Sequence, residues 1–270
     1  MNRFCYSSEF INQPIIFALE NNLVPHEFQL TQVNQVKLSE IIEKGLFDVA
    51  LITPLQYALV KTQLLIVRDI IISSANYGRN ILLYFKESLK KIENIYIRES
   101  KESSYSQFIA SVILNEYFEV KPNWLPVSDN EFKNLQLQKY PLLLLTDDDA
   151  INAGQMYTNF IDLSEELILK TELPFIHQLL VVRKDLERNQ LIEKAISNLK
   201  LSLEIGRRNL VKIAKSFAAG NMASWDYYHD LFEKAIQYHP NQEVWLSLTN
   251  VLNYIFYYGK SNYVRDLKFF

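Results

Sequence analysis

Short runs of apolar residues recur along roughly the first two thirds of the chain, and each has the length of a buried β-strand. Between these runs, apolar residues repeat at intervals of three and four, which is the pattern of amphipathic helices. The predicted strands span 4–6, 27–31, 48–52, 66–72, 81–85, 95–97, 124–127, 142–145 and 175–182. The predicted helices span 14–21, 36–43, 54–60, 104–117, 130–138 and 164–170. This alternation favours α/β layers with mostly parallel strands.

The character of the sequence changes after Arg183. Helical patterns fill residues 184–217, 224–237 and 241–258, with breaks at 218–224 and 239–242. Their apolar stripes predict core packing. The aromatic-rich tail is explained equally well by core packing or by the surface of a homodimer.

Two extended segments, at 76–86 and 171–184, have the pattern of strands that cross between lobes. If both cross, one lobe comprises 1–80 plus 184–270 and the other comprises 86–175. The sequence therefore predicts two α/β lobes with a cleft between them, two crossover strands and a helical C-terminal part, the architecture of periplasmic binding proteins.

Small polar residues recur where a predicted strand gives way to a helix. The four junctions read "ITP" (52–54), "ISSAN" (72–76), "ESSYS" (102–106) and "LTDDDAIN" (145–152). Each is explained by helix capping alone. Four such junctions in a bilobal frame, however, predict convergence on a cleft that holds a small carboxylated ligand, because helix N-termini favour anions. The aspartate run lacks identifiable further metal ligands, so capping or solvation is favoured and no metal site is predicted.

Composition excludes several function classes. The formal charge is −3 with basic residues scattered, so no nucleic-acid surface is expected. Cys5 is the only cysteine, which excludes a disulfide framework, and the six glycines form no phosphate-binding loop. The chain begins without the pattern of a signal peptide and contains no apolar run of ~18 residues, so we expect a cytoplasmic protein without membrane insertion.

The histidines do not indicate a zinc hydrolase. His26, His177, His229 and His239 lack the paired spacing of such sites, and no G-x-S-x-G motif is present. His26 and His239 adjoin prolines in predicted turns. His177 lies in the second crossover strand, where it either faces the cleft or is a buried structural histidine.

The segment "GLFDVALITPLQYAL" (45–59) resembles the "G-x-x-D-V-A-L-I-[ST]-[SP]-x-E-Y-A" pattern of the MqnA branch of the MqnA/MqnD family. The likeness continues in order through "ISSANYGRNILLYFKESLKKIENIYI", "SSYSQFIASVIL" and "LLLLTDDDAI". It then extends through "DLSEELILKTELPFIHQLLVVRKDL", which matches "D-L-G-x-E-W-x-x-x-T-G-L-P-F-V-x-A-x-W-x-x-R" without a gap. The chain is therefore similar to this family over most of its length.

The resemblance implies two lobes of the type II periplasmic-binding-protein class and a defined reaction. That reaction is the dehydration of chorismate to 3-[(1-carboxyvinyl)oxy]benzoate in the futalosine route to menaquinone, without a metal or organic cofactor. The partner implied is a small carboxylate substrate. By correspondence, the residues that bind its carboxylate or hydroxyl groups would be Thr53, Ser73, Ser74, Ser104 and Ser106. The implied catalytic residues are Asn12 and Asp148.

The sequence also departs from the family pattern. Asn12 matches the asparagine of "Y-L-N-x-x-P" only with a one-residue deletion, and an ungapped alignment places Ile11 there instead. Glycines of the family pattern are replaced by Asp147 and Glu172, and Tyr105 stands at a threonine position. Because extra acids near an anionic substrate would repel it, two further hypotheses stay open. One is a binding protein without catalysis on the same fold. The other is the sister enzyme that acts on a dehypoxanthine futalosine, whose "P-N-D-T" pattern is absent.

Overall fold

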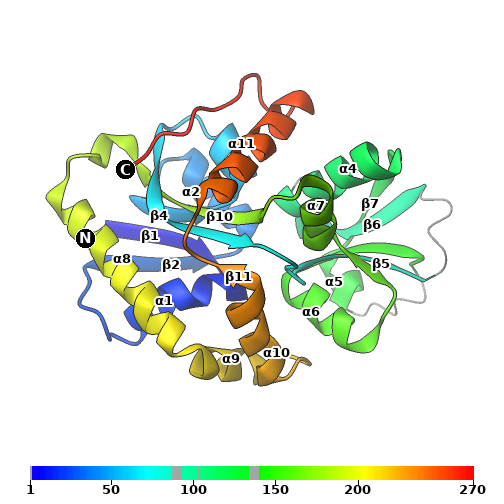
Figure 1. Ribbon diagram of the computed structural model, residues 1–270, viewed down its shortest axis with the longest axis horizontal. Coiled ribbons are helices and arrows are strands. Elements are labelled where there is room, and N and C mark those ends of the chain that lie inside the picture. Colours follow the sequence, from blue (N-terminus) through cyan, green and yellow to red (C-terminus); the bar gives the residue numbers. More distant parts are fainter. Residues whose placement is uncertain (1, 87–92, 102–103, 134–139) are drawn as a thin grey trace.

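The computed structural model describes residues 2–86, 93–101, 104–133 and 140–270, and within them the strands form two separate sheets. The larger sheet has the order β11-β4-β10-β3-β1-β2 and the smaller one β7-β6-β8-β5-β9. Figure 1 shows the two sheets in different halves of the molecule. The larger sheet contains β1 (Asn2–Ser7), β2 (Phe28–Val33), β3 (Val49–Ile52), β4 (Leu64–Ser74), β10 (Phe175–Arg183) and β11 (Ile236–Gln237). The smaller sheet contains β5 (Ile81–Phe85), β6 (Asn94–Arg98), β7 (Asn123–Val127), β8 (Leu142–Thr146) and β9 (Phe160–Asp162).

The expectation of mostly parallel strands is wrong. Among the described residues, four strand pairs are parallel and five are antiparallel. The reason lies in the crossings between sheets. β5 and β10 each enter a sheet from the other lobe, and each is inserted between two strands that run the opposite way. A strand that enters a sheet from the other lobe therefore runs antiparallel to its neighbours.

Helices cover both sheets (Figure 1). They are α1 (Gln13–Glu20), α2 (Gln35–Glu43), α3 (Pro54–Leu59), α4 (Tyr105–Phe118), α5 (Asp129–Lys133), α6 (Asp147–Met156), α7 (Leu163–Thr171), α8 (Gln190–Arg208), α9 (Leu210–Ala218), α10 (Trp225–Asp230) and α11 (Gln242–Tyr257). Every predicted helix has a counterpart, although the part of the 130–138 prediction beyond Lys133 lies outside the described residues. The prediction of helix throughout 184–217 is wrong in part, because a 3-10 turn occupies Lys184–Leu186 and the rest is divided into α8 and α9. The prediction of helix throughout 224–237 is wrong at its end, because β11 adds a short strand to the edge of the larger sheet.

The alternation of side chains along β3 explains how the larger sheet is buried on both faces. Ala50 and Ile52 belong to the core that contains α2, α3, α4 and α11. Val49 and Leu51 belong to the core that contains α1, α8 and α10. All four residues are fully buried, as expected for a strand with helices on both sides. The first of these cores continues into the smaller sheet, so apolar packing joins the two halves of the molecule.

The chain crosses between the sheets in two short segments, 75–80 and 172–174, which overlap the predicted crossing ranges 76–86 and 171–184. The remainder of those ranges consists mainly of β5 and β10, which are strands of the sheets themselves. Asp162 anchors the first segment: its carboxylate accepts hydrogen bonds from the backbone N–H groups of Gly78 (3.2 Å) and Arg79 (2.9 Å). The same carboxylate caps the N-terminus of α7. Within the part of the chain that the structure covers, no helix combines the length and apolar character needed to cross a bilayer.

Candidate functional site

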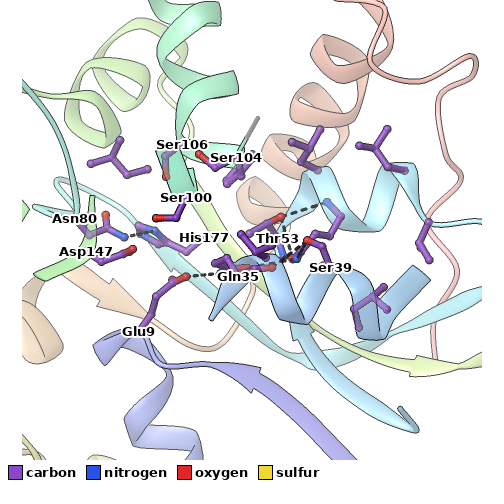
Figure 2. A pocket seen from close by; sticks show the side chains of 18 of the residues that line it. Glu9, Gln35, Ser39, Thr53, Asn80, Ser100, Ser104, Ser106, Asp147 and His177 are labelled. Atoms are coloured by element: carbon purple, nitrogen blue, oxygen red, sulfur yellow. Dashed lines mark hydrogen bonds between the residues drawn. The ribbon is translucent and has the colours of Figure 1, made fainter. Parts of the chain in front are cut away.

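A cavity of about 260 Å³ lies where the first turns of α2, α3 and α4 approach the start of α6 (Figure 2). Its polar lining residues are Glu9, Gln35, Ser39, Glu43, Thr53, Gln56, Asn80, Ser100, Ser104, Tyr105, Ser106, Asp147 and His177. Its apolar lining residues are Val36, Ile42, Leu55, Leu59, Val60, Ile81 and Phe175. The lining comes from both sheets and their helices, so the cavity depends on how the two halves are placed.

The start of α3 forms one wall. Threonine followed by proline begins this helix, because Thr53 is extended and can cap while Pro54 suits the first helical position. The Thr53 hydroxyl accepts a hydrogen bond from the backbone N–H of Gln56 (3.2 Å), and the Gln56 side chain accepts one from the Thr53 N–H (2.9 Å). The Gln56 amide also donates to the hydroxyl of Ser39 on α2 (2.9 Å). The capping box and the bond to Ser39 hold the start of α3 in place against α2.

The start of α4 forms the facing wall. Ser104 caps the helix by accepting a hydrogen bond from the backbone N–H of Gln107 (3.3 Å). Ser106 lies in the first turn and also lines the cavity. The Tyr105 hydroxyl donates to the carbonyl of Ile176 (2.9 Å), and burial raises its pKa well above the ordinary value. Tyr105 therefore serves as a neutral packing residue of this wall.

His177 lies at the inner end of the cavity with both ring nitrogens engaged. Nε2 lies 2.6 Å from the Ser74 hydroxyl, and Nδ1 lies 3.3 Å from the Asn80 amide nitrogen. Figure 2 shows the contact between Asn80 and His177. When Asn80 donates to Nδ1, the imidazole proton must be on Nε2 and point to Ser74. Burial lowers the pKa of His177 to about 3, so the ring is neutral at physiological pH.

Glu9 lines both the main cavity and a smaller one of about 70 Å³. One of its carboxylate oxygens accepts a hydrogen bond from the amide of Gln35, and the other accepts one from the amide of Gln178 (2.8 Å). Gln178 also reaches the Ser7 hydroxyl (3.2 Å), which accepts a further hydrogen bond from the Asn12 amide (3.0 Å). A buried polar network thus connects Asn12 to the wall of the cavity.

Asp147 begins α6 and lines both cavities. Its backbone N–H donates to the carbonyl of Asn80 (2.8 Å), and its φ of +55° is left-handed. A left-handed residue other than glycine costs of order 1–3 kcal/mol and tends to occur at functional sites, with aspartate among the tolerated types.

The charge of the cavity is unusual for a site that accepts acids. Its described lining residues include Glu9, Glu43 and Asp147 but neither lysine nor arginine. The favourable potential for an anion must therefore come from hydroxyl groups and from the first-turn N–H groups of the helices, above all the 14-residue α4.

A family model described as menaquinone biosynthesis matches residues 7–256. The chain belongs to the menaquinone biosynthesis family. This membership confirms the resemblance seen in the motifs and gives the protein a role in menaquinone synthesis. No curated protein matches the chain.

Solved structures establish the fold of this family member. The protein AF1704 from Archaeoglobus fulgidus is 14% identical, with 96% of this chain and 98% of that chain covered and a TM-score of 0.78. The periplasmic aliphatic sulphonate binding protein SsuA from Escherichia coli is 11% identical, with 98% and 90% covered and a TM-score of 0.66. CA3427 from Candida albicans, described as having the generic periplasmic binding protein fold, is 11% identical, with 94% and 89% covered and a TM-score of 0.60. The predicted periplasmic-binding-protein fold is thus confirmed.

The structure brings some of the residues assigned from the family together and separates others. Thr53, Ser104 and Ser106 line the main cavity. Asp148 is exposed and lines the smaller cavity instead. Asn12, Ser73 and Ser74 are buried and lie outside the lining of either cavity, although Ser74 contacts His177 of the main cavity and Asn12 contacts Ser7 of the smaller one. The catalytic and binding roles of all seven stay predictions.

Several lining residues were missed from the sequence. Gln56 carries a local signal, because glutamine three residues after a capping threonine completes a capping box. Glu9, Gln35 and Asn80 carry none, since only the folded chain brings them to the cavity.

Two glycines of the family pattern are replaced by acidic residues, and the structure shows why glycine fits there. Asp147 and Glu172 both have left-handed backbones, with φ of +55° and +56°. Glu172 ends α7 in the conformation that favours glycine at a helix C-terminus. It is exposed and outside the cavity lining, whereas Asp147 is part of that lining. Of the two replacements, only that at Asp147 changes the cavity.

Proposed function

We propose that this family member is a chorismate dehydratase, which converts chorismate into 3-[(1-carboxyvinyl)oxy]benzoate and water. The observation that carries the proposal is the meeting of Thr53, Ser104 and Ser106 in the lining of one cavity. These hydroxyls stand at the starts of α3 and α4, where backbone N–H groups favour an anion. Family membership supports the same proposal by placing the protein in menaquinone synthesis.

The size of the cavity agrees with a substrate that has one ring. Ligand pockets commonly measure ~300–1,000 Å³, so a cavity of about 260 Å³ suits a compact acid. A dehypoxanthine futalosine, which carries a ribose as well as a benzoate ring, fits this volume less well. The partly apolar lining, with Ile81 and Phe175, suits the face of a six-membered ring.

The chemistry asks little beyond orientation and proton transfer. One C–H bond breaks at the ring carbon that carries the ether, and the C–O bond to the neighbouring hydroxyl breaks as well. The new double bond makes the ring aromatic, and hydroxide leaves as water. The protein has to hold two carboxylates, move one proton and stabilise a departing hydroxide.

Under this proposal, hydroxyl groups and helix starts hold the substrate. Thr53 and Ser106 bind its carboxylates from opposite walls, with Ser104 beside them. Ser74 acts behind the cavity by positioning His177, and Ser73 lies next to it on β4. Asn12 and Asp148 keep the catalytic roles implied by the family, Asn12 beside Ser7 and Asp148 in the lining of the smaller cavity.

The decisive experiment is a mass-resolved assay of the purified full chain with chorismate. The expected product is lighter than chorismate by one water and has the absorbance of a benzoate ring. A second measurement records the thermal midpoint with and without chorismate, because a ligand at a hundredfold excess over its Kd stabilises a protein by about 2.7 kcal/mol.

One observation favours an alternative, a protein that binds a small acid without turning it over. The cavity lining contains three carboxylic acids and, among its described residues, no cationic side chain to steady a departing hydroxide or a second carboxylate. A clear thermal shift with unchanged chorismate would support this alternative. If chorismate causes neither a shift nor a product, both hypotheses about this ligand are wrong.

A further inference from the structure

Contacts between helices join the two halves of the molecule on both sides of the crossing segments. α4 and α6 belong to the half with the smaller sheet, called here the smaller lobe, and the rest of each contact belongs to the larger lobe. α4 contacts α11, whereas α6 contacts residues 221–222, which follow α9. In Figure 1, α4 and α11 lie above the strands that join the lobes, and α6 and α9 lie below them. The relative strength of these contacts decides on which side the lobes can separate.

The contact between α4 and α11 is largely aromatic and apolar. The ring of Tyr258, directly after α11, meets the ring of Phe108 edge-on, with the ring centres 6.1 Å apart. The Tyr258 hydroxyl accepts a hydrogen bond from the Asn115 amide and donates one to the Glu116 carboxylate, both at 2.6 Å. Both helices also contribute side chains to one apolar core. Separation on this side would expose aromatic and apolar surface to water, which is unfavourable.

The contact at α6 has an asparagine at its centre. The Asn152 side chain donates to Oδ1 of Asn221 (3.2 Å) and accepts from the backbone N–H of Met222 (2.9 Å). The Asn221 amide is held in turn by the carbonyl of Phe217 (3.1 Å). Beside them, Ile151 is buried in the core that contains α1, α8 and α10. Because Met222 is exposed, water can replace these hydrogen bonds, and the net cost of breaking them is small. The lobes therefore separate more easily at α6.

Separation at α6 would change the access to the cavities. Asp147 and Asp148, at the start of α6, line the smaller cavity, whose other wall includes Ser8 and Asn34 of the larger lobe. Ser8, Asn34 and Asp148 are exposed, so the smaller cavity faces solvent. Glu9 and Asp147 line both cavities, which places the smaller one next to the main one. Movement of α6 away from the larger lobe would widen a path from solvent to the main cavity.

We propose that Asn152 is a positioning residue that latches α6 onto the larger lobe, and that a small acid enters and leaves the main cavity when this latch opens. The contact between α4 and α11 stays joined and acts as the axis of the motion. In the latched state Asn152 fixes the start of α6, and with it Asp147 and Asp148, opposite the larger lobe. For the identity of the ligand, though not for the motion, this inference rests on the proposed function.

A reversible bridge across the latch tests the proposal in the full chain. Asn152→Cys/Asn221→Cys is treated with a short bis-methanethiosulfonate reagent, which joins the two thiols until dithiothreitol is added. The native thiol of Cys5 is buried and does not compete. Turnover of chorismate should be lost when the bridge forms and should return on reduction. A role of Asn152 in stability alone would not produce a reversible loss.

The matched control places the same bridge on the other side of the molecule. Asn115 and Tyr258 are in contact across α4 and α11, so Asn115→Cys/Tyr258→Cys can be joined by the same reagent. Turnover should be the same before and after this bridge forms, because the axis of the motion stays joined in either case. The comparison separates closure of one path from a general effect of cross-linking.

A second measurement needs no ligand. Spin labels at the exposed positions Met156 and Trp225 report the distance between α6 and the larger lobe, and labels at Phe118 and Tyr257 report the distance between α4 and α11. Introducing Asn152→Ala should lengthen the first distance and leave the second unchanged, as measured by double electron–electron resonance.

The outcomes distinguish this inference from the proposed function. A wild-type protein that neither binds nor converts chorismate overturns the proposed ligand, and the spin-label distances then decide on the latch by themselves. An unchanged distance between positions 156 and 225 in Asn152→Ala overturns the latch. Turnover that persists after positions 152 and 221 are bridged also overturns it. Loss of turnover on bridging positions 115 and 258 would show that the lobes do not move about the contact between α4 and α11.

Discussion

The Nε2 atom of His177 lies 2.6 Å from the hydroxyl oxygen of Ser74, at a point where β10 pairs with β4 beside the cavity. The contact joins the strand that leaves the larger sheet to the strand that returns to it. It also places a titratable ring in a buried position, and this has a consequence for stability.

We expect His177 to make the fold sensitive to acid. Burial lowers its pKa to about 3 from an ordinary value near 6.5, so the unfolded chain takes up a proton at a pH where the folded chain does not. Stability from this group is fully present above about pH 6.5 and is lost as the pH falls from there towards 3. Between pH 7 and pH 5 the loss should be about 2 kcal/mol.

Urea unfolding of the wild type and of His177→Gln at both pH values measures this effect. The variant should be less stable at pH 7, because packing and hydrogen bonds are lost, but it should lose less stability on acidification. An equal loss in the two proteins would show that His177 does not titrate in this way.

The serines at the start of α4 allow capping to be separated from ligand binding. Both serines line the cavity, but only Ser104 caps the helix. Ser106 is the second residue of the helix. Ser104→Ala should therefore cost ~1 kcal/mol of stability and weaken chorismate binding. Ser106→Ala should weaken binding with little change in the free energy of unfolding. Calorimetric titration and urea unfolding of both variants give the two quantities, and unchanged affinity in Ser106→Ala would remove this residue from the site.

Close packing of α1 against α8 makes Gly206 a sensitive position far from the cavity. A Cβ atom there would lie 1.9 Å from the carbonyl oxygen of Pro14, so the two helices would have to separate. Gly206→Ala should cost about 3 kcal/mol or more, at the upper end of overpacking effects. Gly220 has nothing within 4 Å of its Cβ position, and Gly220→Ala should change stability by under ~0.5 kcal/mol. Thermal unfolding of the two variants tests the contrast, and equal midpoints would contradict the close approach.

The features that sequence predicts well are those that depend on near neighbours in the chain. The junction from β3 to α3 follows from an apolar run and the Thr53-Pro54 pair, and it forms as expected. The same holds for Ser104, whose capping role is a local property. Both residues reach the cavity because helix starts gather there.

What the sequence could not predict depends on contacts between distant segments. β11 has two residues and exists only because it pairs with the edge of β4. The antiparallel insertion of β10 between β3 and β4 depends on the return of the chain from the smaller sheet. Likewise, Asn80 and His177 are 97 residues apart, and nothing near either of them indicates their contact.

Asn12 offers a last test, because its side chain is buried yet connected to the cavity. Its amide donates to the backbone carbonyl and the hydroxyl of Ser7, both at 3.0 Å, and Ser7 is in turn contacted by Gln178, which holds Glu9. Asn12→Ala should lower stability by roughly 1–3 kcal/mol, since Ser7 loses a buried partner, and should abolish most turnover of chorismate. Ser7→Ala is the matched comparison, because it breaks the same network while leaving Asn12 in place. If both variants lose turnover alike, Asn12 acts by positioning Glu9 through the network. If turnover is lost only in Asn12→Ala, its amide acts on the substrate directly, and the cavity must then extend past Glu9 when chorismate binds. Retention of turnover in Asn12→Ala would remove Asn12 from the mechanism.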